Sequence, residues 1–170
     1  MAAPFNDVFM DQVNAAGITH VVGVPDGWLA PLIDQLEAAN TITYVPAARE
    51  EEAIGIASGF AMAGKKTMVM MQNVGFLNSV GCFATLPLNY RIPFVMLIAN
   101  RGNLFDKNNY DIPKIRYMEN TLDSMNLLRT SYYQYKEEDN LLKKVMDRAE
   151  TAQEPCFLLL DYPPHGKEAC

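Results

Sequence analysis

The sequence predicts an α/β protein with a doubly wound, mainly parallel sheet flanked by helices. Short apolar segments rich in β-branched residues alternate along the chain with segments of helical periodicity. The segment Ile92–Ala99 is apolar throughout, as expected of a central strand buried on both faces. No internal repeat, low-complexity stretch or linker divides the chain, so residues 1–170 are expected to form a single domain.

The elements follow in chain order from periodicity and from turn residues. Phe5, Val8 and Phe9 share one face of a first helix that ends at Gly17, and a β-rich apolar run begins at His20. Helices are predicted at Phe5–Ala16, Trp28–Ala39, Arg49–Ala63, from the turn 72–78 to near Pro87, Leu122–Leu128 and Leu141–Thr151. Strands are predicted at His20–Val24, Thr41–Val45, Thr67–Met71, Ile92–Ala99 and Cys156–Asp161, and one long irregular segment at Asn100–Met118.

The helix predicted at Arg49–Ala63 carries the first candidate functional residue. At about 100° per residue, Glu50 falls within the apolar stripe, whereas Glu51 and Glu52 turn toward the other side. A carboxylate that faces apolar groups either finds a partner or becomes harder to ionise, which makes Glu50 the candidate. Acidic residues in a first helical turn also complement the helix dipole, and that is the role expected of Glu51 and Glu52.

The same helix is unusually small in its side chains. Gly55, Ser58 and Gly59 leave much of its surface bare. Glycine inside a helix costs about 1 kcal/mol relative to alanine, so its presence indicates a close approach by another backbone. The helix is therefore expected to pack on several sides, including against another chain.

Composition excludes several classes of partner. A net charge of −6 without a basic cluster argues against nucleic acid and anionic membranes, and no apolar run is long enough to span a bilayer. The first residues carry acids where a secretion signal carries bases. Three widely spaced cysteines and two distant histidines show no metal-ligand spacing, so the chain itself is expected to hold no metal. We expect a cytoplasmic protein with reduced thiols.

Two turns occupy places where open α/β sheets bind ligands, because each follows a predicted strand. Pro25-Asp26-Gly27 follows the first strand, and the segment 72–78 follows the third. A strand, a glycine-containing turn and a helix start can bind an anion, although a single glycine is weak support. Asp26 is equally well explained as a helix cap, and polar residues in 72–78 as turn formers.

Three sequence blocks carry a family resemblance, in the order VVGVPDGWLAPLIDQL (21–36), REEEAIGIASGFAMAGKK (49–66) and MQNVGFLN with IPFVMLIANRG (71–78 and 92–102). Together they resemble the pyrimidine-binding domain of thiamine-diphosphate enzymes, and most closely the separate alpha subunit of sulfopyruvate and phosphonopyruvate decarboxylases. The most specific element is the spacing from Glu50 to Gly59-Phe60-Ala61.

The resemblance implies that Glu50 activates the cofactor. In this family the carboxyl group hydrogen-bonds a pyrimidine ring nitrogen and favours the proton transfers that prepare thiamine diphosphate to attack a 2-oxo acid, from which carbon dioxide leaves. It also implies cofactor contacts in the two turns, with the alternatives given above. These predicted contacts are Pro25, Asp26, Gly27, Gln72, Asn73, Val74, Gly75 and Asn78.

One half of the family's active site is missing. No GDG sequence followed by paired asparagines is present to bind Mg²⁺ and the diphosphate group. The resemblance therefore implies a separate beta chain with that motif, and a hetero-oligomer with at least two copies of each chain. Alone, this chain is expected to be inactive.

Departures from the family pattern leave the substrate open. Val74 and Leu77 stand where the family has a small hydroxyl residue and glycine, and no histidine lies two residues after Pro113. A sulfonate or phosphonate calls for cationic donors. The candidates are Arg101, Lys107, Lys114 and Arg116, and a solvated loop face is the alternative for each. Another 2-oxo acid, carboligation, or a non-catalytic regulatory subunit of the same fold are further alternatives.

Overall fold

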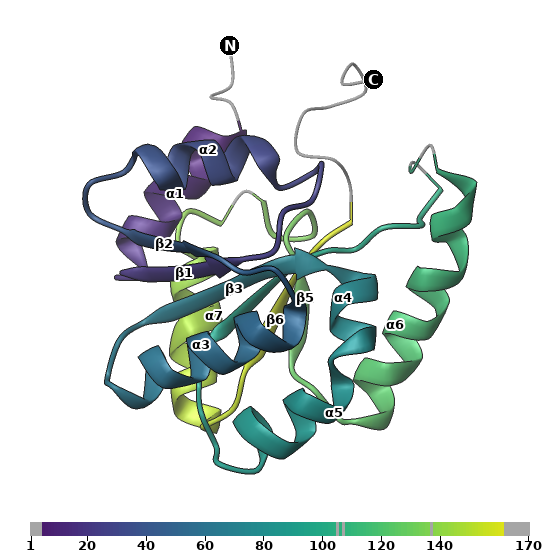
Figure 1. The fold of residues 1–170 in the computed structure, drawn as a ribbon. Helices are drawn as coiled ribbons and strands as arrows, with labels where there is room; N and C mark the ends of the chain where they lie inside the picture. The colour runs from purple at the N-terminus through teal and green to yellow at the C-terminus, as the bar shows by residue number, and fades with distance from the viewer. Residues whose placement is uncertain (1–4, 105, 107, 137, 162–170) are drawn as a thin grey trace.

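Six strands form one sheet in which every pairing is parallel (Figure 1). The structure, a computed structural model, describes residues 5–104, 106, 108–136 and 138–161. The strand order is β2-β1-β3-β4-β6-β5. The strands are β1 (His20–Gly23), β2 (Thr43–Pro46), β3 (Thr67–Gln72), β4 (Val95–Ala99), β5 (Arg129–Ser131) and β6 (Cys156–Leu160). The predicted α/β class is confirmed, and the sheet is wholly parallel within the described residues.

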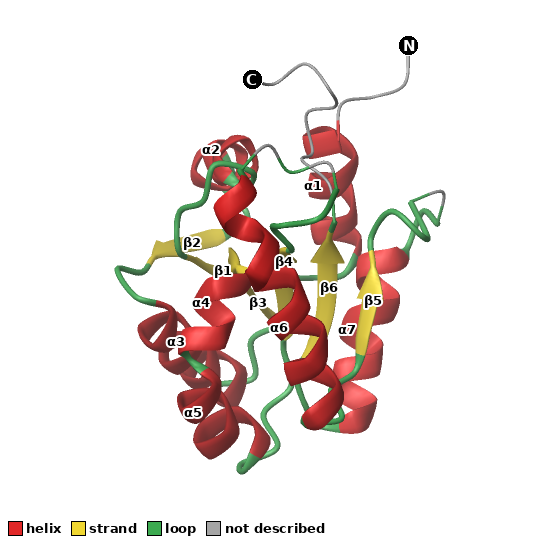
Figure 2. Ribbon diagram, turned by 90° about the vertical axis from the view of Figure 1, so that its right-hand side faces the viewer, coloured by secondary structure: helices red, strands yellow, loops and turns green. Residues whose placement is uncertain are grey.

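Helices cover both faces of the sheet (Figures 1 and 2), as a doubly wound fold requires. Helices α1, α2 and α7 pack on one face, and α3 to α6 on the other. Alternate strand residues face opposite sides, so Met68 and Met70 join the first cluster and Val69 and Met71 the second. The helices are α1 (Phe5–Ala15), α2 (Ala30–Ala38), α3 (Glu50–Met62), α4 (Asn73–Asn78), α5 (Val80–Phe83), α6 (Ile112–Ser124) and α7 (Leu141–Ala152), with a π-helix, η1 (Ala84–Leu88), and a 3₁₀ turn, η2 (Asn109–Asp111).

The segment after β4 differs from its prediction. An irregular segment was expected at Asn100–Met118 and a helix at Leu122–Leu128, but α6 begins at Ile112 and ends at Ser124. Pro113 lies in the first turn of α6, where a missing N–H costs no helical hydrogen bond, so it does not interrupt the helix. Met118 and Leu122, one turn apart, supply the buried face.

Two further local predictions are corrected. The segment 72–78 is helix α4 from its second residue rather than a turn. The strand β5 was not predicted, because its three residues Arg129-Thr130-Ser131 are polar and only partly buried at the sheet edge. The strand lies in a segment that follows a chain reversal at Asn126, whose φ is 54°.

The order of the strands places a ligand-binding position between β1 and β3. The chain leaves β1 for its neighbour β2 on one side and returns as β3 on the other side. Ligands of open α/β sheets bind outside the carboxyl ends of strands at such a switch point. The turn after β1 and the start of α4 after β3 border this point. None of the helices in the described part of the chain combines the length and apolar character needed to cross a bilayer.

Candidate functional site

Glu50 is the first residue of α3 and lies close to the switch point. The backbone of Arg49 is extended, with φ at −141°, and the helix starts immediately after it. As the periodicity predicts, Glu50 continues the face formed by Ala53, Ile54 and Ala57, which are buried. Glu50 itself is half-buried, so its carboxylate lies at the border between the core and the solvent.

The Glu50 side chain lies directly against the backbone of Gly75. A Cβ atom added to Gly75 would lie only 2.6 Å from Cδ of Glu50, closer than real Cβ atoms approach other heavy atoms. This contact joins α3 to α4, two helices that follow different strands. Among the described residues, no hydrogen bond or ion pair engages the Glu50 carboxylate, so it is free to accept a ligand.

The two neighbouring glutamates have local roles at the helix start. The Oε2 atom of Glu52 accepts a hydrogen bond from the backbone N–H of Ala48 at 2.9 Å. Glu51 forms a surface ion pair of 3.8 Å with Arg49. These contacts stabilise the N-terminal end of α3 and agree with the roles predicted for both residues.

Asn73 is fully buried and links the start of α4 to the end of β4. Its Nδ2 atom donates to Oδ1 of Asn100 at 3.3 Å and to the backbone oxygen of Arg101 at 2.8 Å. Its Oδ1 atom is buried without a hydrogen-bond partner within the described part of the chain. Around it, Gln72 and Val74 are partly buried, and Asn78 is exposed at the end of α4.

A row of polar side chains continues from Asn73 along the carboxyl ends of the strands. Asn100, after β4, donates through Nδ2 to Oδ1 of Asp161, after β6, at 2.8 Å. The hydroxyl of Ser131, the last residue of β5, donates to the other oxygen of Asp161. Sequence reasoning missed Asn100, Asp161 and Ser131 as a group, although each ends a strand or directly follows one. Beside them, Asn103 and Leu104 border a pocket of about 540 Å³.

Arg101 is the centre of a buried cluster of charges. Its guanidinium contacts three carboxylates, and its Cζ atom lies over the ring of Trp28, 4.7 Å from the ring centroid. The N–O distances are 3.1 Å to Asp26, 2.8 Å to Asp106 and 3.2 Å to Asp111. Burial alone would lower the pKa of Arg101, but the three carboxylates together raise it above its ordinary value. The alternative for Arg101, a position on a solvated loop face, is therefore wrong.

The carboxylates of this cluster are held by the backbone as well. Burial would raise the pKa of Asp106, but hydrogen bonds from Arg101 and from the N–H groups of Asn108 and Gly102 outweigh burial and lower it. Gly102 has a φ of +98°, and an added Cβ would collide with the backbone of Asp111. Gly102, Asp106, Asn108 and Asp111 are thus held close together beside the guanidinium.

The helix-cap alternative for Asp26 is wrong, since the N-cap of α2 is Leu29 and no described side chain caps that helix. Asp26 instead stabilises the turn that precedes α2. Its Oδ1 atom accepts a hydrogen bond from the N–H of Trp28 at 2.9 Å, while its other oxygen pairs with Arg101. Both polar atoms of this side chain are therefore engaged within the chain. The flanking Pro25 and Gly27 are exposed at the carboxyl end of β1, where a ligand can reach them.

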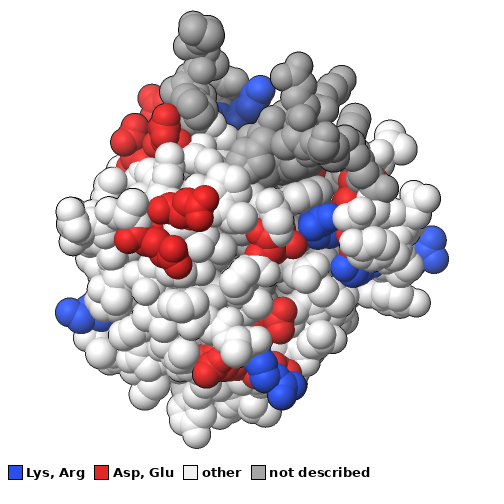
Figure 3. All heavy atoms as spheres, turned by 45° about the horizontal axis from the view of Figure 1, so that its top comes forward, with Lys and Arg blue, Asp and Glu red and all other residues white. Residues whose placement is uncertain are grey.

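The other predicted anion-binding residues lie in different surroundings. The Lys114 ammonium pairs with Asp111 and lies 3.5 Å from Oε1 of Gln72. Arg116 is exposed on α6. Lys107 lies outside the described residues. In the described part of the chain, no group of three or more acidic, histidine or cysteine side chains is arranged to hold a metal ion. Figure 3 shows acidic and basic side chains intermixed, without a continuous basic surface on the face drawn.

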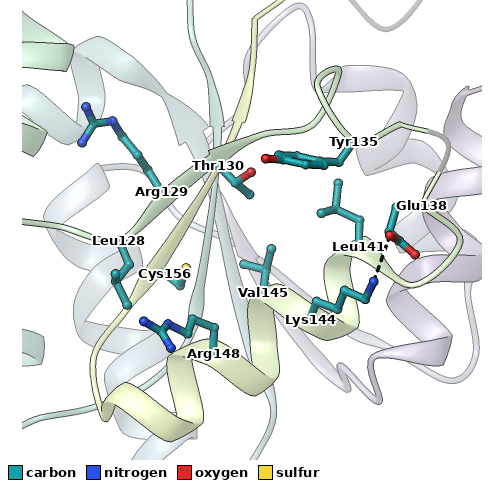
Figure 4. A pocket seen from close by; sticks show the side chains of 10 residues that line it. All are labelled: Leu128, Arg129, Thr130, Tyr135, Glu138, Leu141, Lys144, Val145, Arg148 and Cys156. Atoms are coloured by element: carbon teal, nitrogen blue, oxygen red, sulfur yellow. Dashed lines mark ion pairs between the residues drawn. The ribbon is translucent and has the colours of Figure 1, made fainter.

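A second hollow, of about 370 Å³, lies along the edge strand β5 and helix α7, on the opposite edge of the sheet from β2 (Figure 4). An ion pair of 2.9 Å between Lys144 and Glu138 borders it. Cys156 lies at its base, between Leu128 and Val145. Glu50 follows β2, the outer strand at the other edge of the sheet, so this hollow is separate from the surroundings of Glu50.

The buried thiol in that hollow is expected to be unreactive. Burial raises the pKa of Cys156 to about 11. At pH 8 only about one molecule in a thousand then carries the reactive thiolate. We expect iodoacetamide to modify Cys156 in urea but not in the native protein, and to modify the half-buried Cys82 earlier, as measured by peptide mass spectrometry. Native alkylation of Cys156 at the rate of a free thiol would contradict this expectation.

Comparisons with known proteins identify the family to which the chain is related. Residues 4–127 match the family described as thiamine pyrophosphate enzyme, N-terminal TPP binding domain. Sulfopyruvate decarboxylase subunit alpha of Methanococcus maripaludis is 31% identical over 157 residues, covering 89% of this chain and 92% of that protein. The protein of the same name from Methanocaldococcus jannaschii is 39% identical over 108 residues, 64% of either chain.

A solved structure supports the same fold. The thiamine diphosphate-dependent 4-hydroxybenzoylformate decarboxylase of Rhodococcus jostii RHA1 matches with a TM-score of 0.70 at 16% identity, over 96% of this chain and 31% of that chain. At this identity the likeness shows the fold alone. The family match, however, spans Glu50, Gly75 and the carboxyl ends of β1, β3 and β4. The chain therefore belongs to the family of N-terminal, TPP-binding domains of thiamine pyrophosphate enzymes.

Proposed function

We propose that this chain is the pyrimidine-binding alpha subunit of a two-chain, thiamine-diphosphate-dependent decarboxylase that acts on a 2-oxo acid. The observation that carries the proposal is the carboxylate of Glu50. It is half-buried, lies against Gly75 beside the switch point of the sheet, and forms no hydrogen bond or ion pair with any other described residue. A carboxylate in that position is suited to share a proton with a ring nitrogen of the cofactor.

The residues of this chain fit the pyrimidine end of thiamine diphosphate. When bound, the cofactor supplies the electron-withdrawing ring that makes loss of carbon dioxide from a 2-oxo acid possible. Glu50 would hold the proton at the pyrimidine, and the apolar side chains of Ala53 and Ile54 beneath it limit the access of water. Pro25, Gly27 and Val74 lie at the carboxyl ends of β1 and β3 and are the proposed lining of the site.

The proposal includes a partner chain that binds the diphosphate and Mg²⁺. The supporting sequence observation is that the GDG motif of the family is missing. The supporting structural observation concerns Gly55 and Gly59. Apart from the neighbouring backbone of α3 itself, no atom of the described residues lies within 4 Å of a Cβ added to either. The described part of this chain does not explain why these two positions lack side chains, and their absence suits contact with a second chain. At least two copies of each chain and a cytoplasmic location are part of the proposal.

Sulfopyruvate is the first substrate to test, because both archaeal relatives described above are named for it. Recognition of its sulfonate by Arg101, Lys114 or Arg116 stays a prediction. Arg101 and Lys114 already contact three carboxylates between them, so an additional anion there would meet a cluster of net negative charge. We therefore assign the terminal anion of the substrate to exposed cations such as Arg116, or to the partner chain.

The experiment is co-expression with the product of the neighbouring reading frame. Carbon dioxide release would be measured from sulfopyruvate, phosphonopyruvate and pyruvate, with thiamine diphosphate and Mg²⁺ added or omitted. We expect release that requires both chains and the cofactor. A stable complex that binds cofactor but releases nothing from these substrates would point to another 2-oxo acid or to carboligation. Absence of cofactor binding in a stable complex would support the non-catalytic alternative.

A further inference from the structure

We propose that the junction of β3 and α4 is the seat that fixes the Glu50 carboxylate, and that Gly75 and Asn73 are positioning residues rather than cofactor contacts. Gly75 leaves the space that the carboxylate occupies. Asn73 fastens the helix that carries Gly75 to the end of β4. The inference rests on the proposed function of Glu50, and it assigns to two residues a role that acts through that side chain.

The first argument is the reason for a glycine at position 75. Its φ lies outside the left-handed region, so the backbone conformation there is open to any residue. A helical glycine costs about 1 kcal/mol relative to alanine, and this cost calls for an explanation. Space provides it, since the Cγ, Cδ and Oε1 atoms of Glu50 fill the volume that a Cβ would need. By contrast, a Cβ on Gly81 would meet nothing within 4 Å.

The second argument is the way α4 is held. A helix of six residues has little stability of its own, and its N-cap residue, Gln72, forms no capping hydrogen bond through its side chain. The two hydrogen bonds from Nδ2 of Asn73 therefore set where α4 starts relative to β4. A fully buried side chain cannot also touch a cofactor held at the surface of the sheet edge.

The third argument is that Glu50 has no other restraint on its carboxylate. Arg49, the N-cap of α3, forms no side-chain capping hydrogen bond, and no described side chain pairs with Glu50. Contact with the Gly75 backbone is thus the feature that limits where the carboxylate can lie. Since a misplacement of about 1 Å at a reacting group can cost 10²-fold in rate, this seat bears directly on turnover.

The test compares Gly75→Ala with the control Gly81→Ala in the two-chain complex. Alanine is the better helix former, so neither change should lower the melting temperature through the helix itself. For Gly75→Ala we expect about 10²-fold lower turnover. We also expect a dissociation constant for thiamine diphosphate, measured calorimetrically without substrate, that is raised about tenfold, as for one lost charge-assisted hydrogen bond. For Gly81→Ala we expect neither effect.

A double-mutant cycle distinguishes an effect of Gly75 that acts through Glu50 from a general disturbance of the structure. If Gly75 acts through the Glu50 side chain, Gly75→Ala should not raise the cofactor dissociation constant further in a Glu50→Ala background, which lacks the atoms that contact Gly75. Should Gly75→Ala destabilise the complex instead, Glu50→Ala in the same chain removes the colliding atoms and should restore the melting temperature. Equal losses of cofactor affinity in both backgrounds, or no rescue by Glu50→Ala, would overturn the inference.

The outcomes also distinguish the inference from the proposed function. Full turnover of the Glu50→Gln complex would remove the role of Glu50 and with it the proposed function. An inactive Glu50→Gln complex together with a fully active Gly75→Ala complex would leave the proposed function intact and show that Gly75 does not position the Glu50 carboxylate. Weakened cofactor binding by Gly81→Ala to the same extent would equally count against the seat.

Discussion

Replacing Glu50 by glutamine is expected to lower the turnover number of the two-chain enzyme by roughly 10²–10⁴-fold, the range typical of general acid–base catalysis. The amide has nearly the same size as the carboxylate, so it should still lie against Gly75. It cannot, however, share a proton with a ring nitrogen in the same way. The measurement is steady-state turnover of the reconstituted complex at saturating cofactor, with the state of assembly followed by gel filtration.

The matched control is Glu52→Gln, in the same helical turn. The amide oxygen of glutamine can still accept the hydrogen bond from the Ala48 N–H, and Glu52 is exposed. Its substitution should leave turnover within about twofold, as expected for a surface change of at most about 0.5 kcal/mol. If the two variants lose activity equally, the effect belongs to the charge of the helix end rather than to Glu50.

Removing the guanidinium of Arg101 is expected to be the most destabilising single change of charge in the described part of the chain. Arg101→Met leaves Asp26, Asp106 and Asp111 buried without their common cation. Breaking a buried ion pair by removing one partner costs about 3–5 kcal/mol, and we expect a loss of that size in the free energy of unfolding. Urea denaturation of the wild-type and variant chains measures it.

Arg129→Met is the matched control, because Arg129 also contacts two carboxylates, Glu119 and Asp123, but at the surface. Exposed pairs contribute about 0–1 kcal/mol, so this variant should lose little stability. Similar losses of unfolding free energy in the two variants would show that the stability contributed by the Arg101 cluster does not depend on its burial.

The Arg101 effect should depend on pH in a defined direction. The pKa of Asp106 is lowered below 3.8 in the folded protein, so this group contributes stability above pH 3.8 that disappears as the pH falls through its folded value. In Arg101→Met the carboxylate of Asp106 lacks that partner, and its protonation in acid removes an unpaired buried charge. The difference in stability between wild type and variant should therefore shrink below about pH 4, near the ordinary pKa of aspartate. A difference that grows in acid would contradict the charge cluster.

The sequence predicts elements whose own residues determine them. Strands β3, β4 and β6 are apolar runs buried on both faces, and their positions are confirmed within one to three residues. The direction in which Glu50 points is likewise determined by the residues of a single helix, α3. In contrast, β5 is polar because it lies at an edge, and its identity depends on pairing with β6.

Contacts between distant segments could not be predicted. Arg101 contacts Asp26 across 75 positions of sequence, and no local pattern distinguishes that guanidinium from a solvated one. The contact of Glu50 with Gly75 joins two different crossover segments in the same way. Local patterns predict which residues are candidates for chemistry, whereas the packing of the sheet decides which of them meet.

The position of β6 has a consequence for the synthesis of the chain. It is the last described strand, yet it lies between β4 and β5. On the ribosome, β4 therefore keeps an unpaired edge, and β5 lacks its neighbour, until residues 156–160 leave the exit tunnel. Asp161, which ties Asn100 to Ser131, arrives at the same moment. Parallel pairing over such sequence distances is slow and leaves apolar strands exposed. A newly made chain thus completes the edge that bears its polar row only after residues 156–161 have emerged, and its apolar strand edges stay exposed to aggregation until then.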